Sequence, residues 1–234
     1  MSRLPEAVLL DALGTLVALE PPAPKLRHAL SSGFGVAVSG RDAERAIAAE
    51  IAYYRAHLDE GRDQATLGEL RRACARVMWA ALPAEANEQL DPEALVPVLL
   101  ESLEFTVFDD VRPSLRELRD RGLSVVVVSN WDVSLTDVLR RLGLSPLLDG
   151  IVTSAAVGAR KPAAAIFEHA LRLARTAPGR AAHVGDSVLE DVEGARAAGI
   201  EAILVRRDGS SGPPGVRTIK SLAGLATAIE EYEP

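Results

Sequence analysis

The sequence predicts an α/β protein built on a doubly wound parallel sheet, with an all-helical domain inserted after the first strand. Two observations lead to this class. Short apolar runs alternate with helical patterns from about residue 114 onward, which is typical of a parallel sheet. Between residues 24 and 103 the apolar residues instead follow helical spacing, and no strand-like alternation interrupts them.

The first strand is predicted at Ala7–Leu10, four apolar residues that suit a strand buried on both faces. Asp11 follows directly, and Gly14 and Thr15 turn the chain away. Further strands are expected at 123–128, 151–152, 181–184 and 202–205, and helices at 114–121, 133–142, 163–173 and 189–198. Glycines that follow several of these helices mark their ends.

The insertion begins with a Pro-rich segment, Ala18–Pro24, which we interpret as a loop. Helices are predicted over 41–59, 67–82 and 92–103, the last with a proline inside it. The predicted domains are therefore a core of residues 1–18 and 109–234 and a helical domain of residues 19–108. Asp109 and Asp110 are expected to form a solvated hinge.

Composition excludes several classes of partner. The 234 residues carry a formal net charge of -7 and contain no basic run, which argues against nucleic-acid binding. No segment approaches the length of a membrane span. Cys74 is the only cysteine, so no internal disulfide is possible, and we expect a cytoplasmic protein.

Polar side chains stand where the predicted strands end. Asp11 and Ser129 each follow an apolar run, Lys161 opens a helix, and Asp186 follows the strand at 181–184, with Asp191 further on. Strands of a parallel sheet share one carboxyl edge, so these residues can converge. Several carboxylates gathered there need a cation, and Mg²⁺ with a bound phosphate fits this donor set. We expect the Ser129 hydroxyl and the Lys161 charge to hold phosphoryl oxygens and Asp11 to attack as nucleophile.

Four segments together resemble the haloacid dehalogenase (HAD) superfamily. They are Asp-Ala-Leu-Gly-Thr-Leu from Asp11, Ser-Asn at Ser129, Lys-Pro at Lys161, and Gly-Asp-Ser-Val-Leu-Glu-Asp from Gly185. The resemblance implies a Rossmann-like core, a C1-type helical cap over the site, and Mg²⁺-dependent hydrolysis of a small phosphorylated metabolite through an aspartyl-phosphate.

The same resemblance assigns roles to individual residues. It implies catalytic roles for Asp11 and Lys161. The residues that it implies for binding are Thr15, Ser129, Asn130 and Lys161 for the phosphoryl group, and Asp11, the Leu13 carbonyl, Asp186 and the supporting acid Asp191 for the metal.

Leu13 departs from the pattern, because phosphatases of this superfamily usually carry a second Asp two residues after the nucleophile. That Asp serves as acid for the leaving group and as base for water. Its absence removes a contribution of roughly 10²–10⁴-fold. We therefore expect either slow turnover of alkyl phosphates or restriction to acyl and aryl phosphates.

Three alternatives remain open at this stage. Dehalogenases of the superfamily also lack the second Asp, although an acid at Asp186 would repel a haloacid carboxylate. Phosphonate hydrolases need a cap lysine, and the insertion offers only Lys25. A third possibility is a protein that binds Mg²⁺ and a phosphorylated ligand without turnover.

His183 is expected to be a core histidine, and the sequence leaves the oligomeric state open.

Overall fold

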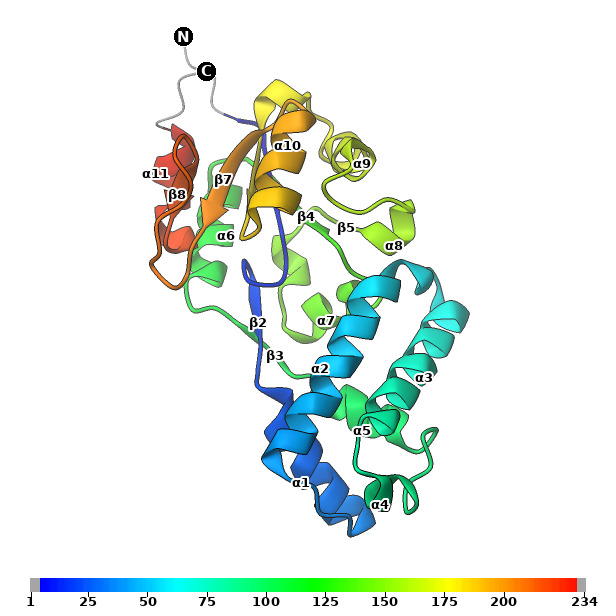
Figure 1. The fold of residues 1–234 in the computed structure, drawn as a ribbon. Coiled ribbons are helices and arrows are strands. Elements are labelled where there is room, and N and C mark those ends of the chain that lie inside the picture. Colours follow the sequence, from blue (N-terminus) through cyan, green and yellow to red (C-terminus); the bar gives the residue numbers. More distant parts are fainter. Residues whose placement is uncertain (1–4, 231–234) are drawn as a thin grey trace. The chain divides into compact units, whose positions relative to one another are not determined.

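A six-stranded parallel sheet in the order β5-β4-β1-β6-β7-β8 forms the centre of the larger part of the chain (Figure 1). The computed structural model describes residues 5–230. The strands are β1 (Ala7–Leu10), β4 (Ser124–Ser129), β5 (Gly150–Thr153), β6 (Ala181–Gly185), β7 (Glu201–Val205) and β8 (Arg217–Ile219). The predicted fold class, a doubly wound parallel sheet, is confirmed.

Helices cover both faces of this sheet. They are α6 (Val111–Asp120), α7 (Leu135–Arg141), α8 (Ser154–Val157), α9 (Ala164–Ala174), α10 (Gly194–Ala197) and α11 (Leu225–Glu230). Buried residues of α9 and α10 form one apolar cluster with alternate residues of the strands. From the other face α6 packs against β4, and α11 packs against α6. Both faces of β1 are thereby buried, which explains why its four residues are all apolar.

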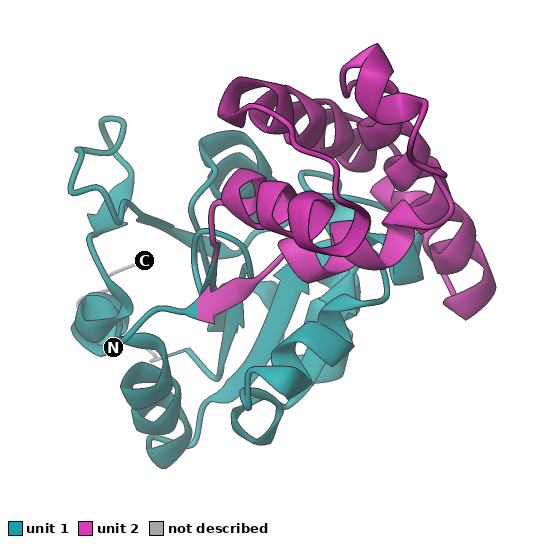
Figure 2. Cartoon of the chain, turned by 90° about the horizontal axis from the view of Figure 1, so that it is seen from below, with its two compact units in different colours: residues 1–18, 107–234 teal, residues 19–106 magenta. Residues whose placement is uncertain are grey.

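The chain divides into two compact units, drawn in different colours in Figure 2. The core unit comprises residues 1–18 and 107–234, and the helical unit comprises residues 19–106. The sequence had suggested residue 109 for the return to the core. The chain passes between the units through β2 (Val17–Leu19) and β3 (Phe105–Val107), which pair with each other.

The helical unit contains α1 (Pro22–Phe34), α2 (Gly40–His57), α3 (Gln64–Ala80), α4 (Ala84–Asn87) and α5 (Leu95–Ser102). The interpretation of Ala18–Pro24 as a loop is wrong, because Pro22 begins a helix. Proline is tolerated in the first helical turn, where its missing N–H has no helical partner in any case. Ala23, Leu26 and Leu30 of this helix then join the apolar core of the unit.

The predicted helix 189–198 is in fact two segments. A π-helical turn, η4 (Val188–Glu193), precedes α10. The Val192 N–H donates to Ser187 O, five residues back, at 3.2 Å. Short 3₁₀ turns lie at Leu58–Glu60, Ser145–Leu147, Pro178–Arg180 and Leu222–Gly224. The short strands β3 and β8 and the helix α11 were also absent from the sequence expectation.

Glu50 is an acidic residue inside the apolar core of the helical unit. It lies on α2, is 2% exposed, and accepts a hydrogen bond from the Cys74 side chain. Burial raises the pKa of Glu50 to about 7, and the hydrogen bond from Cys74 only partly opposes this. A neutral carboxylic acid is thus the form that the folded unit accommodates.

We expect the stability of the protein to fall as the pH rises from about 4.5 to about 7. In that window the folded state keeps a proton on Glu50 that the unfolded state has released, so the free energy of unfolding decreases by roughly 3 kcal/mol. Glu50→Gln should flatten this part of the profile, measured by urea unfolding at several pH values. Glu44→Gln, on an exposed position of the same helix, is the control and should keep the slope. An unchanged slope in Glu50→Gln would contradict the assignment.

Candidate active site

The carboxyl edge of the sheet brings together most of the residues that the sequence singled out. The register aligns Leu10 with Val127 and with Val184, so Asp11 emerges beside the ends of both neighbouring strands. Its own N–H donates to Val184 O at 2.9 Å. Ser129 is the last residue of β4, and Asp186 follows the last residue of β6.

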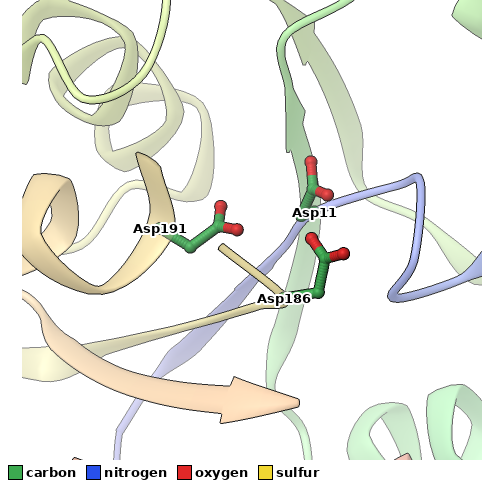
Figure 3. Close-up of side chains that lie close together, drawn as sticks. All are labelled: Asp11, Asp186 and Asp191. Carbon is green, nitrogen blue, oxygen red and sulfur yellow. The ribbon is translucent and has the colours of Figure 1, made fainter. Parts of the chain in front are cut away.

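Three carboxylates meet at this edge. Each of Asp11, Asp186 and Asp191 offers an oxygen, and these oxygens lie within 4.8 Å of one another (Figure 3). They come from three separate elements, the end of β1, the end of β6 and η4. Asp11 and Asp191 are buried and Asp186 is partly buried.

Lys161 lies between two of the carboxylates. Its Nζ donates to Asp11 Oδ1 at 2.7 Å and to Asp191 Oδ1 at 2.5 Å, and the residue is 1% exposed. Burial would lower the pKa of Lys161, but the charges of Asp11 and Asp191 outweigh it and raise the pKa, so the ammonium stays charged. The Ser129 hydroxyl donates to the same Asp11 oxygen at 2.8 Å.

The backbone of Lys161 is fixed by Asn130. The Lys161 N–H donates to Asn130 Oδ1 at 2.7 Å, and Asn130 Nδ2 donates to the Lys161 carbonyl at 3.0 Å. The Asn130 side chain therefore positions the lysine, and the role of Asn130 in phosphate binding stays a prediction.

Asp191 is held by three protein groups. Besides Lys161, His183 Nε2 lies 2.8 Å from Oδ1, and the Ser187 N–H donates to Oδ2 at 2.9 Å. Burial would raise the pKa of Asp191, but the charge of Lys161 and the hydrogen bond from His183 lower it below its usual range. The π-helical turn η4 presents this carboxylate to the lysine, and such turns are frequent at functional sites.

His183 was expected to be a core histidine, and it is fully buried on β6. It also contacts the site through Asp191, which sequence reasoning missed. Because an ionised carboxylate only accepts hydrogen bonds, Nε2 is the nitrogen that donates to Asp191, and Nδ1 has no hydrogen-bond partner among residues 5–230.

Burial and neighbouring charge raise the pKa values of Asp11 and Asp186. Burial raises the pKa of Asp11, and the charge of Lys161 offsets this only in part. Burial and the charges of Asp11 and Asp191 raise the pKa of Asp186 to about 6. One lysine faces three carboxylates here, so the donor set fits a hard divalent cation such as Mg²⁺.

Leu13 and Thr15, two further residues of the predicted site, lie in the turn after Asp11. Leu13 forms an isolated bridge with Val17. Thr15 is fully buried, and within the described part of the chain its hydroxyl has no hydrogen-bond partner.

Comparison with known proteins agrees with this geometry. A model of the haloacid dehalogenase-like hydrolase family matches residues 5–199. The chain belongs to this family. It is 33% identical over 205 residues to haloacid dehalogenase-like hydrolase domain-containing protein 3 of Mus musculus, which covers 83% of this chain and 79% of the relative.

Other relatives are named as phosphatases. The chain is 38% identical over 102 residues to a glyceraldehyde 3-phosphate phosphatase of Methanothermobacter thermautotrophicus, which covers 43% of this chain and 45% of the relative. The chain spans only about half of the length of some relatives. It matches 53% of the human haloacid dehalogenase-like hydrolase domain-containing protein 3 and 45% of this phosphatase.

Solved structures show the same fold. An HAD phosphatase from Thermococcus onnurineus superposes with a TM-score of 0.65 at 26% identity, over 95% of this chain and 96% of the other. A 2-haloacid dehalogenase from Pseudomonas syringae superposes with a TM-score of 0.69 at 23% identity, over 97% and 99%, which is a likeness of fold.

Gly14 lies in the turn after Asp11 and leaves no room for a side chain. Its φ is +78°, and a Cβ there would stand 2.2 Å from Asp186 Oδ2. Gly14→Ala should displace Asp186 and weaken Mg²⁺ binding, measured by calorimetric titration.

Gly122→Ala is the matched control, because Gly122 has φ +79° and nothing within 4 Å of its Cβ position. Both variants carry a backbone cost of about 1–2 kcal/mol, but only Gly14→Ala should lose Mg²⁺ affinity. Equal Mg²⁺ affinities in the two variants would contradict this role of Gly14.

Proposed function

We propose that this hydrolase is a Mg²⁺-dependent phosphatase of small phosphorylated metabolites, with Asp11 as the nucleophile. The observation that carries the proposal is the hydrogen bonding of the Asp11 carboxylate, which differs between its two oxygens. Both of its hydrogen-bond donors, Ser129 and Lys161, meet Oδ1, and no hydrogen bond from residues 5–230 reaches Oδ2. Oδ2 is therefore the oxygen available to attack phosphorus.

The chemistry follows from this arrangement. Oδ2 forms a bond to phosphorus while the bond from phosphorus to the leaving oxygen breaks, which gives an aspartyl-phosphate and an alkoxide or carboxylate. The oxygen of a water molecule then forms a bond to phosphorus while the bond from phosphorus to Oδ2 breaks, which releases phosphate and restores Asp11; the proton that the water loses passes to solvent, from which an alkoxide takes up a proton. Lys161 and Ser129 stabilise the charge on the phosphoryl oxygens.

The residues that would hold Mg²⁺ are Asp11, Asp186 and the Leu13 carbonyl, with Asp191 as the supporting acid. When bound, Mg²⁺ supplies positive charge that lowers the pKa of the neighbouring carboxylates and offsets the charge of the phosphoryl group. Burial raises the pKa of Asp11, and a bound cation would oppose that shift.

We further propose that the helical unit acts as a cap that determines the substrate. The chain leaves the core unit at residue 18, soon after Asp11, and returns at residue 107. Within residues 5–230 no helix has the length and apolar character that a membrane crossing requires. The cytoplasmic location stays a prediction.

The first test is phosphate release from an aryl phosphate and from acetyl phosphate, with and without Mg²⁺. We expect release that depends on Mg²⁺ and is abolished in Asp11→Asn. Asp137→Asn makes the same chemical change on the exposed face of α7 and should retain full activity. Absence of release from either compound by the unaltered protein would favour binding without turnover, and release that persists in Asp11→Asn would exclude this nucleophile.

The second test concerns Leu13. An acid there would protonate the leaving oxygen, so Leu13→Asp should raise the turnover of alkyl phosphates by up to about 10²–10⁴-fold and change aryl phosphate turnover little. The names of the relatives suggest glyceraldehyde 3-phosphate and ribulose 1,5-bisphosphate as alkyl substrates. Leu13→Asn, similar in shape but unable to donate as an acid, is the control. An equal effect of both variants would contradict the role of the missing acid.

A further inference from the structure

Two consecutive arginines follow β7 at the same edge of the sheet as the site. Arg206 and Arg207 are the first residues beyond Val205, where β7 ends. Arg206 Nη1 donates to the main-chain carbonyl of Asp186 at 2.6 Å. This bond ties the loop that carries Asp186 to the end of the neighbouring strand.

Arg207 contacts the turn that follows the nucleophile. Its Nε donates to Gly14 O at 3.2 Å, and its Nη2 donates to Thr15 O at 2.5 Å. The turn packs directly on Asp186, since a Cβ at Gly14 would lie 2.2 Å from Asp186 Oδ2. A rotation of these peptide units would therefore move the turn and change the space that is left for the Asp186 carboxylate.

The Arg207 side chain is itself held on two further sides. Its Nη1 lies 3.0 Å from Asp110 Oδ1 and 3.2 Å from Oδ2, and Asp110 also accepts the Leu222 N–H. The guanidinium stacks over the Phe108 ring, with Cζ 3.7 Å from the ring centroid. Asp110 is thus a half-buried ion-pair partner and not the solvated hinge residue that the sequence suggested, and its side chain is 15% exposed.

We propose that Arg207 is a positioning residue for the carboxylate site. It holds the Gly14–Thr15 turn against Asp186 and thereby sets the affinity of the site for Mg²⁺. This inference rests on the proposed function. A guanidinium suits the task because its planar fork reaches two consecutive carbonyls and an aspartate together, which a lysine ammonium cannot do. Groups that orient metal ligands from outside typically change metal affinity by about 10–100-fold when they are removed.

The chain offers a matched control in Arg112. It also donates to two consecutive main-chain carbonyls, those of Leu142 and Gly143, but these follow α7 and are not part of the site. Loss of either arginine removes hydrogen bonds to two consecutive carbonyls. Arg207 also loses its ion pair with Asp110 and its contact with Phe108, and only Arg207 contacts the turn beside Asp186.

The experiment measures Mg²⁺ binding by calorimetry without substrate, and the thermal midpoint, for Arg207→Met and Arg112→Met. We expect both variants to lose thermal stability, but only Arg207→Met to bind Mg²⁺ about tenfold or more weakly. Its rate of phosphate release should recover as Mg²⁺ is raised. Arg207→Lys, which keeps the charge but not the fork, should also bind Mg²⁺ more weakly.

Asp110→Asn is a second variant that tests the role of Arg207 in Mg²⁺ affinity if Arg207→Met does not fold. It keeps Arg207 but weakens its anchor, so a smaller loss of Mg²⁺ affinity is expected. Unchanged Mg²⁺ affinity in the folded Arg207 and Asp110 variants would overturn the inference and leave the proposed function intact. Absence of Mg²⁺ binding by the unaltered protein would overturn the Mg²⁺ dependence of the proposed function, and this inference with it.

Discussion

The buried ammonium of Lys161 is the interaction on which the rest of the site depends. Two carboxylates buried side by side would each cost several kcal/mol of desolvation without a compensating charge, and Lys161 compensates both. Because Asn130 fixes the lysine backbone, the ammonium links the ends of β1 and β4 to η4. No ammonium or guanidinium among residues 5–230 pairs with the Asp186 carboxylate, and burial and the charges of Asp11 and Asp191 raise its pKa to about 6.

The arginines around the site leave this charge imbalance in place. Arg206 and Arg207 donate to main-chain carbonyls of the two loops and not to the carboxylates that those loops carry. The positive charge of Arg207 is directed instead to Asp110. These hydrogen bonds fix the backbone of the two loops but do not balance the charge of their carboxylates. A rigid group of oxygens that keeps its negative charge is the environment in which a divalent cation binds well.

Sequence reasoning predicted the parts of this design that depend on local pattern. Asp11, Ser129 and Asp186 were found because each follows an apolar run and parallel strands end at one edge. The helices α2 and α3 followed from apolar spacing. Arg207 was missed because no local signal shows that a side chain after β7 reaches a turn near residue 14, although a search for polar residues at every strand end would have found it. The π-helical turn was also missed, since no local signal shows the close approach of Gly194, the residue after it, to Pro162, whose Cα lies 2.9 Å from the Gly194 Cβ position.

The insertion after β1 also determines the order in which the protein is completed during synthesis. The sheet partners of β1 are β4 and β6, and both follow the whole helical unit in the chain. The helical unit emerges from the ribosome in full, with contacts that are mostly local, while the apolar segment Ala7–Leu10 still lacks both neighbours. The strand that leads into Asp11 is therefore synthesised first and is completed only when β6, the later of its two partners, has left the ribosome.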